Sequence, residues 1–271
     1  MSQIQWTDQT WNPVTGCSRV SPGCMNCYAE KMAWRLMNMG NKASEYYAGT
    51  TRKTEGGKIQ WTGRINTVPS ALDKPRRAKK PTMFFVNSMS DLFHPDIPLD
   101  FLMQIWEVIR STPRHTYQIL TKRPENILER LPEDWGEGYP NVWLGVSIEG
   151  QGYVHRAETL SEVPAKLRFI SAEPLLSSLR FFQASQLWRL NIGWVIIGGE
   201  SGPSARLCDP SWLTDLVRDC HSAGVPVFVK QVGSSLARQW GLKDKKGGNP
   251  GEWPIGALIC REWPEVIYEN Q

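Results

Sequence analysis

Short apolar segments that end in polar residues recur along this chain, and they constrain its fold more than any other feature. The segments cover residues 83–86, 116–120, 142–146, 167–170, 194–197 and 225–229. Each is almost continuously apolar, which is typical of a parallel β-strand that is buried on both faces. Helical periodicity follows three of them, at 99–110, 125–131 and 211–223. The alternation of strand and helix therefore predicts an α/β protein with a parallel sheet.

An earlier strand–helix junction near the N-terminus extends this series. A loop at 16–27 leads into a segment, 28–39, whose apolar residues recur at helical spacing. The count then approaches seven units, which favours a partial or full (β/α) barrel over a doubly wound sheet. The chain has 271 residues, 41% of them hydrophobic, which suffices for one large domain. We expect a single barrel domain over 1–271, with a polar insertion at about 42–80 and a C-terminal lid or tail at about 240–271.

Polar side chains stand where the predicted strands end. In (β/α) barrels the carboxyl ends of the strands carry the chemistry, so these side chains should converge on one mouth. The alternative for any single one is a helix N-cap or a turn residue. The candidates are Asn87, Ser90, Asp91, Lys122, Ser147, Glu149, Glu173, Glu200, Lys230 and Gln231.

Three of the six cysteines, Cys17, Cys24 and Cys27, lie within eleven residues on a Gly/Pro-rich loop. Six cysteines are too sparse for a disulfide scaffold, and a tight thiol cluster more often binds metal. Three thiolates hold three irons of a 4Fe-4S cluster and leave the fourth iron open to an exogenous ligand. Zinc is the rival, and it would need a fourth ligand such as Cys208 or His94. Thiols without any metal are the remaining alternative.

Basic residues gather on both sides of residue 70. The formal net charge is +4, and five positive charges fall within residues 74–80. Arg52, Lys53, Lys58, Trp61 and Arg64 precede them. Cations interleaved with an aromatic residue suit a phosphate backbone and a stacking platform, although a solvated basic loop without a partner explains them equally well. The sequence has neither an apolar run of membrane-spanning length nor a secretory leader pattern, so we expect no membrane association and a cytoplasmic location.

The order of motifs resembles a known superfamily. A cysteine triad that opens a β/α barrel, with a glycine-rich strand end and polar rim residues, is similar to the radical S-adenosylmethionine enzymes. The chain also resembles the phage-associated three-cysteine-motif family, whose activity is not settled, and more distantly spore photoproduct lyase. The runs that carry the resemblance are GCSRVSPGCMNCYAE, FFVNSMSDLFHPDIP, YQILTKRPE, VWLGVSIE, FISAEPLL, VIIGGESGPSAR, VPVFVKQVG and GALICREWPE.

The resemblance implies a cofactor and a set of roles. Cys17, Cys24 and Cys27 would ligate a 4Fe-4S cluster, and the amino and carboxylate groups of S-adenosylmethionine would chelate the open iron. Reductive cleavage would give methionine and a 5'-deoxyadenosyl radical that abstracts hydrogen from the substrate. We assign Asn87, Ser90, Asp91, Lys122, Ser147, Glu149 and Glu173 to cofactor binding, and Glu200, Arg206, Lys230 and Gln231 to the catalytic, substrate-facing side. An ion pair between Lys230 and Glu200 is the structural alternative.

The sequence thus favours a radical S-adenosylmethionine enzyme that modifies or repairs nucleic acid. One alternative is a zinc-stabilised protein that binds nucleic acid without catalysis. Another is a radical enzyme that acts on a small phosphorylated metabolite, because Arg206 and Lys230 suit a phosphate or a carboxylate. We expect DNA or RNA as a partner and an external electron donor for the cluster. Whether a partner protein supplies part of the active site stays open.

Overall fold

The structure, a computed structural model, describes residues 4–179 and 184–265. Its main sheet has seven strands in the order β1-β6-β7-β8-β9-β10-β11. The pairs β1–β6, β6–β7, β9–β10 and β10–β11 are parallel. The strands follow one another in chain order, without the reversal that marks a doubly wound sheet. This is the strand order of a partial (β/α) barrel with β1 and β11 as its edges, which confirms the predicted fold class.

The chain divides into two compact units, Met1–Trp143 and Leu144–Gln271. The boundary falls inside β8 (Val142–Ser147), and each unit is described by itself. The expected single domain over 1–271 stays a prediction. No helix within the described ranges is both long and apolar enough to span a membrane.

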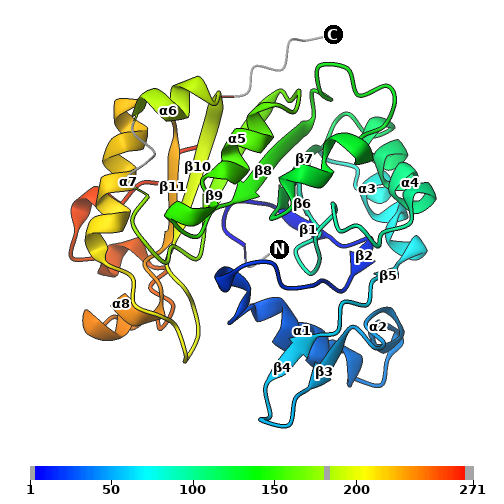
Figure 1. Ribbon diagram of the computed structural model, residues 1–271, viewed down its shortest axis with the longest axis horizontal. Helices are drawn as coiled ribbons and strands as arrows, with labels where there is room; N and C mark the ends of the chain where they lie inside the picture. The colour runs from blue at the N-terminus through cyan, green and yellow to red at the C-terminus, as the bar shows by residue number, and fades with distance from the viewer. Residues whose placement is uncertain (1–3, 180–183, 266–271) are drawn as a thin grey trace. The chain divides into compact units, whose positions relative to one another are not determined.

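Unit 1 contains the first strands of the main sheet and an aromatic core. Phe84 of β6 stacks on Tyr117 of β7 at 5.7 Å between ring centroids, and Trp11 of β1 lies 5.6 Å from Tyr117. The helices α3 and α4 lie side by side (Figure 1). The main elements are β1 (Gln9–Trp11), α1 (Tyr28–Met37), β6 (Met83–Val86), α4 (Leu99–Arg110) and β7 (Thr116–Thr121).

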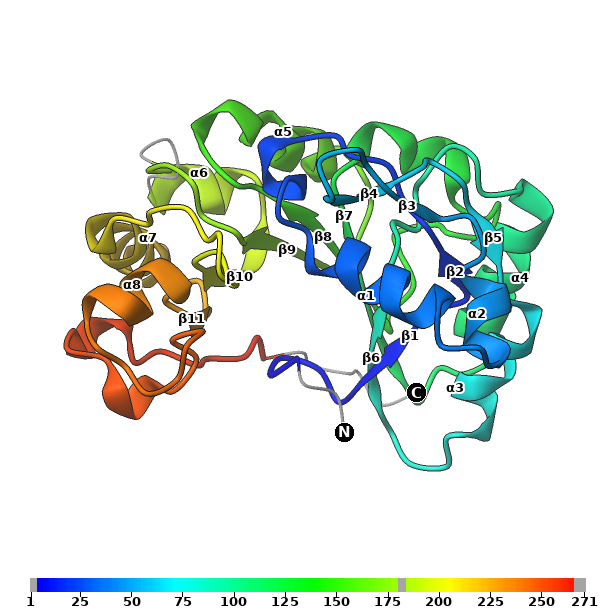
Figure 2. The same ribbon diagram turned by 90° about the horizontal axis from the view of Figure 1, so that it is seen from below.

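The polar insertion at 42–80 packs around α1. Its hairpin of β3 and β4 lies beside α1 (Figures 1 and 2), where Trp61 packs against a core cluster that includes Ala29, Ala33 and Tyr47. Trp61 is therefore a half-buried residue that contributes to packing, and its use as a stacking platform stays a prediction. The elements are α2 (Lys42–Tyr46), β3 (Thr51–Lys53), β4 (Ile59–Trp61), β5 (Asn66–Thr67), which pairs with β2 (Val14–Thr15), and α3 (Asp73–Arg77).

Unit 2 contains the last strands of the sheet. Helices α6 and α7 lie side by side, and α7 packs on β10 and β11 (Figure 1). Trp194 of β10 forms the centre of the core, 5.9 Å from Phe169 and 6.3 Å from Phe228. After α8 the chain returns to β11, where the Val229 N–H donates to the Cys260 carbonyl at 2.8 Å. The elements are α5 (His155–Ser161), β9 (Leu167–Ala172), α6 (Ala184–Arg189), β10 (Ile192–Gly198), α7 (Pro210–Ser222), β11 (Val227–Gln231) and α8 (Ser234–Gln239).

Two sequence expectations need comment. The helix expected at 125–131 is wrong, because this segment forms two 3-10 turns, Pro124–Asn126 and Leu128–Arg130. Leu131, directly before Pro132, is extended with ψ 152°, because proline disfavours the α conformation at the residue before it, and the segment ends there. The lid or tail expected at about 240–271 is described only to residue 265, and residues 266–271 lie outside the described part.

Gly145 in β8 provides a test of the packing in unit 2. A Cβ atom at this position would lie 2.4 Å from the Phe169 ring, which is fully buried. Gly145→Ala should therefore lower the free energy of unfolding by about 1–3 kcal/mol, as overpacked cores do. Urea denaturation measures this change. Gly152→Ala, where a Cβ meets nothing within 4 Å, should change stability by less than about 0.5 kcal/mol. Equal effects of the two substitutions would contradict the packing described here.

Candidate cofactor site

The loop that carries the cysteines is held to the end of β6. The Asn87 N–H donates to the Trp11 carbonyl at 2.8 Å, and Ser90 Oγ donates to the Val14 carbonyl at 2.9 Å. The Tyr28 hydroxyl, directly after Cys27, donates to the Ser88 carbonyl at 2.7 Å. Because β1 and β6 are parallel neighbours, their carboxyl ends meet at one edge of the sheet. The cysteine loop therefore lies at the edge where the sequence predicts chemistry.

The backbone of the loop is shaped by a glycine and a short turn. Gly16 has φ +89°, and a Cβ there would lie 2.1 Å from the Arg64 carbonyl oxygen, so no other residue fits. A 3-10 turn over Pro22–Cys24 follows, and Cys27 then occupies the N-cap of α1. The three thiols are thus presented from one loop and the first turn of one helix.

The three thiols share one electrostatic environment. Burial raises the pKa of Cys17 to about 12, with further increases from Asp91, Cys27 and Cys24, whereas Arg123 lowers it. Burial also raises the pKa of Cys27, and the backbone N–H groups of Ala29 and Glu30 act in the opposite direction. Without a cation the thiols of Cys17 and Cys27 hold their protons at neutral pH, so binding of a metal centre there has to displace protons.

Arg123, at the end of β7, faces Cys17. Its side chain is buried, with 4% of the residue exposed. Nη1 donates to Asp91 Oδ2 at 3.1 Å and lies 4.0 Å from Cys17 Sγ. Nη2 donates to the carbonyl and the hydroxyl oxygen of Ser18, at 2.9 and 2.8 Å. The guanidinium therefore places a fixed positive charge beside the first thiol, which favours the thiolate.

Asp91 organises the strand ends around this arginine. Its carboxylate also accepts hydrogen bonds from Thr121 Oγ1 at 2.7 Å and from the backbone N–H groups of Phe93 and Lys122, both at 3.1 Å. Asp91 is 5% exposed. With all of these partners, Asp91 positions Arg123 and the ends of β6 and β7. Lys122 contributes its backbone to this arrangement and has a partly exposed side chain.

Two residues outside the predicted site complete its support. His94, 2% exposed, lies with Nε2 2.8 Å from Ser18 Oγ. The Asp96 N–H donates to His94 Nδ1 at 3.2 Å, which assigns the proton to Nε2. Burial lowers the pKa of His94, so this imidazole is neutral. His94 therefore donates to the cysteine loop, and its expected use as a fourth zinc ligand stays a prediction.

Glu30 in the first turn of α1 is the second of these residues. Arg19 of the cysteine loop binds it through two hydrogen bonds, Nε to Oε1 at 2.7 Å and Nη2 to Oε2 at 2.6 Å. Trp61 N of β4 donates to Oε1 at 3.1 Å. A carboxylate three residues after Cys27, at the positive end of a helix, was the sequence signal for this anchor.

Asn87 differs from its neighbours because its side chain is not satisfied. The residue is 3% exposed and has φ +57°, and both its Nδ2 and its Oδ1 are buried without a hydrogen-bond partner among the described residues. Buried amide groups are normally paired, so an unpaired one calls for a specific explanation. Its position at the end of β6, beside the cysteine loop, makes it the best candidate for contact with a bound group.

In unit 2 the predicted acidic residues are paired with cations. Glu149, 1% exposed, accepts from Arg156 Nη1 at 2.9 Å. The same Nη1 donates to the Ser147 carbonyl at 2.8 Å. The Glu200 carboxylate accepts three hydrogen bonds from Arg206. They come from the Arg206 backbone N–H at 2.9 Å, from its Nε at 3.0 Å and from its Nη2. These pairs fix the strand ends of β8 and β10.

Lys230 pairs with Glu173 and not with Glu200. Its Nζ lies 2.6 Å from Glu173 Oε1. The Gln231 side chain donates to the Gly199 carbonyl at 2.9 Å, and the Gly199 N–H donates to the Gln231 carbonyl at 3.0 Å. A Cβ on Gly199 would lie 2.2 Å from the Val232 carbonyl oxygen, so the glycine permits this close approach of two loops. Gln231 therefore acts as a structural link here.

The structure thus forms two groups from the predicted residues. One group, in unit 1, contains the three cysteines with Asn87, Ser90, Asp91 and Lys122. The other, in unit 2, contains Ser147, Glu149, Glu173, Glu200, Arg206, Lys230 and Gln231. That both groups share one mouth stays a prediction.

The spacing of the thiols bears on the kind of metal centre. A single tetrahedral zinc, with Zn–S bonds of about 2.3 Å, holds its sulfur ligands about 3.8 Å apart. Within the described ranges, one group of three potential metal ligands has its ligand atoms within 4.8 Å of one another. It consists of His221, Cys260 and Glu262. The three N-terminal cysteines are not in this group, and the choice between a cluster and a zinc ion at their loop stays a prediction.

Fold and site together define a partial (β/α) barrel protein with a three-cysteine loop at the carboxyl end of its first strands. The chain belongs to the family described as "Protein of unknown function (DUF5131)", whose model matches residues 1–252. Searches of curated proteins and of solved structures found no match. The family match includes all three cysteines of the loop and both groups of strand-end residues.

Removal of the Asp91 charge tests the role of this residue. Asp91→Asn leaves the buried Arg123 guanidinium without its anionic partner, and loss of one partner of a buried ion pair costs about 3–5 kcal/mol. Urea denaturation of the variant should show a loss of this size. Asp96→Asn is the matched control, because the Asp96 side chain is 69% exposed. This substitution should change the free energy of unfolding by less than about 0.5 kcal/mol. Equal stability of the two variants would refute the proposed anchoring role.

Proposed function

We propose that this protein is a radical S-adenosylmethionine enzyme whose 4Fe-4S cluster is held by Cys17, Cys24 and Cys27. The observation that carries the proposal is the three-thiol loop at the carboxyl end of β1 and β6, beside the buried cation of Arg123. Three thiolates hold a cubic cluster and leave one iron open. Among the described residues, a zinc ion at this loop would need a fourth ligand besides the three thiols, whereas a cluster with one open iron needs none.

The residues around the loop fit the cofactor pair. A reduced cluster held by Cys17, Cys24 and Cys27 would supply the electron for reductive cleavage of S-adenosylmethionine, and the 5'-deoxyadenosyl radical so formed would abstract hydrogen from the substrate. Arg123 lowers the pKa of Cys17 and thereby favours the thiolate form that ligation requires. Asn87 offers one amide donor group and one acceptor oxygen, both without partners among the described residues, to a polar ligand such as the amino acid part of S-adenosylmethionine.

The cysteine loop and α1 expose four large apolar side chains. Val20, Met25, Tyr28 and Met32 are between 42% and 60% exposed. Exposed apolar groups that gather at a site mark a surface that binds an apolar or aromatic ligand. We infer that these residues help to exclude water around the reacting groups, which protects a radical from side reactions.

We propose nucleic acid as the substrate. Arg52, Lys53 and Lys58 are exposed on the β3–β4 hairpin, and Glu30 links this hairpin to the cysteine loop through Trp61 and Arg19. Exposed cations on one hairpin suit a phosphate backbone.

The exposed cations also favour nucleic acid over a small phosphorylated metabolite. The cations proposed for that alternative, Arg206 and Lys230, are already paired with the carboxylates of Glu200 and Glu173. A phosphate would have to compete with those carboxylates for either cation.

Anaerobic reconstitution with iron and sulfide tests the enzyme proposal. The protein should develop broad visible absorbance and, with dithionite and S-adenosylmethionine, release 5'-deoxyadenosine. Cys24→Ala should abolish both signals because one cluster ligand is lost. Cys208→Ala should retain both, since Cys208 is buried in unit 2. Stoichiometric zinc without any uptake of iron would instead support the zinc-stabilised binding protein.

A salt titration of DNA and RNA binding tests the substrate class. Each phosphate contact contributes about 0.9 to the slope of log affinity against log salt for duplex DNA. Arg52→Gln/Lys53→Gln/Lys58→Gln should therefore weaken binding and reduce the slope by about 2–3. Lys243→Gln/Lys245→Gln/Lys246→Gln removes three exposed cations from unit 2 and should change neither quantity. An affinity that does not depend on salt would remove the nucleic-acid proposal.

A further inference from the structure

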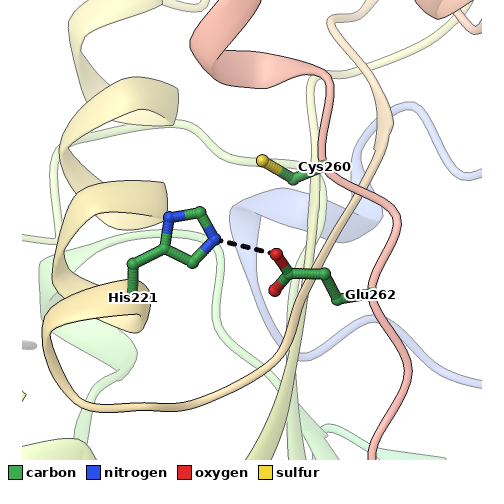
Figure 3. A group of neighbouring side chains, drawn as sticks. All are labelled: His221, Cys260 and Glu262. Atoms are coloured by element: carbon green, nitrogen blue, oxygen red, sulfur yellow. Dashed lines mark hydrogen bonds and ion pairs between the residues drawn. The ribbon is translucent and has the colours of Figure 1, made fainter.

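A histidine, a cysteine and a glutamate converge in unit 2, apart from the residues used above. The ligand atoms of His221, Cys260 and Glu262 all lie within 4.8 Å of one another, and Figure 3 shows the three side chains beside one another, with the His221 ring facing the Glu262 carboxylate. His221 Nε2 is 3.1 Å from Glu262 Oε1. All three residues are at least partly accessible to solvent. Cys260 and Glu262 lie beyond residue 252, where the family match ends.

The backbone presents Cys260 and Glu262 on one side of the chain. Residues 260–262 run beside β11, with an antiparallel bridge between Phe228 and Arg261. Alternate residues of an extended chain point to the same side, so Cys260 and Glu262 share one side. Arg261 points to the other, where its guanidinium lies 5.5 Å from the Phe228 ring centroid. His221 meets the pair from the last turn of α7.

Hydrogen bonds hold this arrangement in place. Glu262 Oε2 accepts from the Val227 N–H at 2.9 Å, while the Glu262 N–H donates to the Val227 carbonyl at 3.0 Å. The Cys260 carbonyl accepts from the Val229 N–H at 2.8 Å. The Trp194 indole donates to the Glu262 carbonyl at 2.9 Å. The carboxylate therefore has one oxygen fixed by the backbone and the other directed at His221, as in metal sites whose ligands are oriented by outer partners.

We propose that His221, Cys260 and Glu262 form a second metal site that takes Zn²⁺. Imidazole nitrogen, thiolate sulfur and carboxylate oxygen are the three ligand types of zinc, with bonds of about 2.0–2.3 Å. At a tetrahedral centre such bonds separate nitrogen and oxygen ligands by about 3.3 Å, close to the 3.1 Å found between His221 and Glu262. A thiolate and a carboxylate also balance the charge of the divalent ion. Three protein ligands leave a fourth position for water.

Binding requires a small change at the cysteine. Cys260 Sγ lies 3.3 Å from the Ala257 carbonyl oxygen, so the thiol donates there in the metal-free chain. On binding, the thiol releases its proton to solvent and the sulfur turns to the ion. The ion also replaces the proton that His221 Nε2 directs at Glu262, so the neutral ring then carries its proton on Nδ1. The site then connects the end of α7 to the segment beside β11. This role does not depend on the cluster proposed for unit 1.

A cobalt titration tests the site, with Co²⁺ as a spectroscopic substitute for zinc. The full chain with Cys17, Cys24 and Cys27 changed to alanine should bind one Co²⁺ and show both a thiolate charge-transfer band and tetrahedral d–d bands. Loss of a residue that only hydrogen-bonds to a metal ligand lowers metal affinity about 10–100-fold. His221→Asn or Cys260→Ala in this background should therefore weaken binding at least about 100-fold. His155→Asn, at another exposed histidine of unit 2, should leave it unchanged.

A second measurement does not need the cysteine-free background. Zn²⁺ should protect Cys260 of the unaltered chain from alkylation, as read residue by residue by mass spectrometry. The protection should disappear in His221→Asn, while the fully buried Cys220 should stay unreactive throughout. Cobalt bound without a thiolate band, or protection of Cys260 that survives in His221→Asn, would overturn the proposal.

Discussion

A single guanidinium, that of Arg123, is buried at the carboxyl end of β7, and a buried cation must be met by negative or polar atoms. Asp91 supplies the charge, Ser18 supplies two oxygens, and Cys17 supplies a sulfur. These partners come from the ends of two strands and from the N-terminal loop. One charge thus determines how the cysteine loop lies against the sheet. Burial and Asp91 raise the pKa of the Cys17 thiol, and the same guanidinium acts against this rise, so one group both supports the loop and favours the thiolate.

The strand ends of unit 2 follow a similar rule with different residues. Glu149, Glu173 and Glu200 each bind a cation, and two of the three are almost fully buried. Desolvation costs are large for such pairs, so their value lies more in fixing the geometry of loops than in net stability. Residues at the mouth of a barrel can therefore be charged without contacting a ligand themselves. Asn87, whose amide has no partner among the described residues, stands out against this background.

Glu30 gives the polar insertion a place in the site. Through Arg19 and Trp61, one buried carboxylate connects the cysteine loop, α1 and the β3–β4 hairpin. The cations on the hairpin and the thiols of the loop are therefore parts of one framework. At the other end of the chain, His221 and Glu262 connect α7 to the C-terminal segment. In both cases a carboxylate holds together segments that are distant in sequence.

The sequence by itself determined the sheet, because continuous apolar runs such as 83–86 and 194–197 can be buried only as interior parallel strands. It also determined the thiol loop, since Cys17, Cys24 and Cys27 are local in the chain. The pairing of charges was decided only by the tertiary structure. The sequence suggested an ion pair between Lys230 and Glu200, yet Lys230 binds Glu173, because strand order and register select the partner. His221 and Cys260 likewise meet only because α7 and the final segment pack against the same strand.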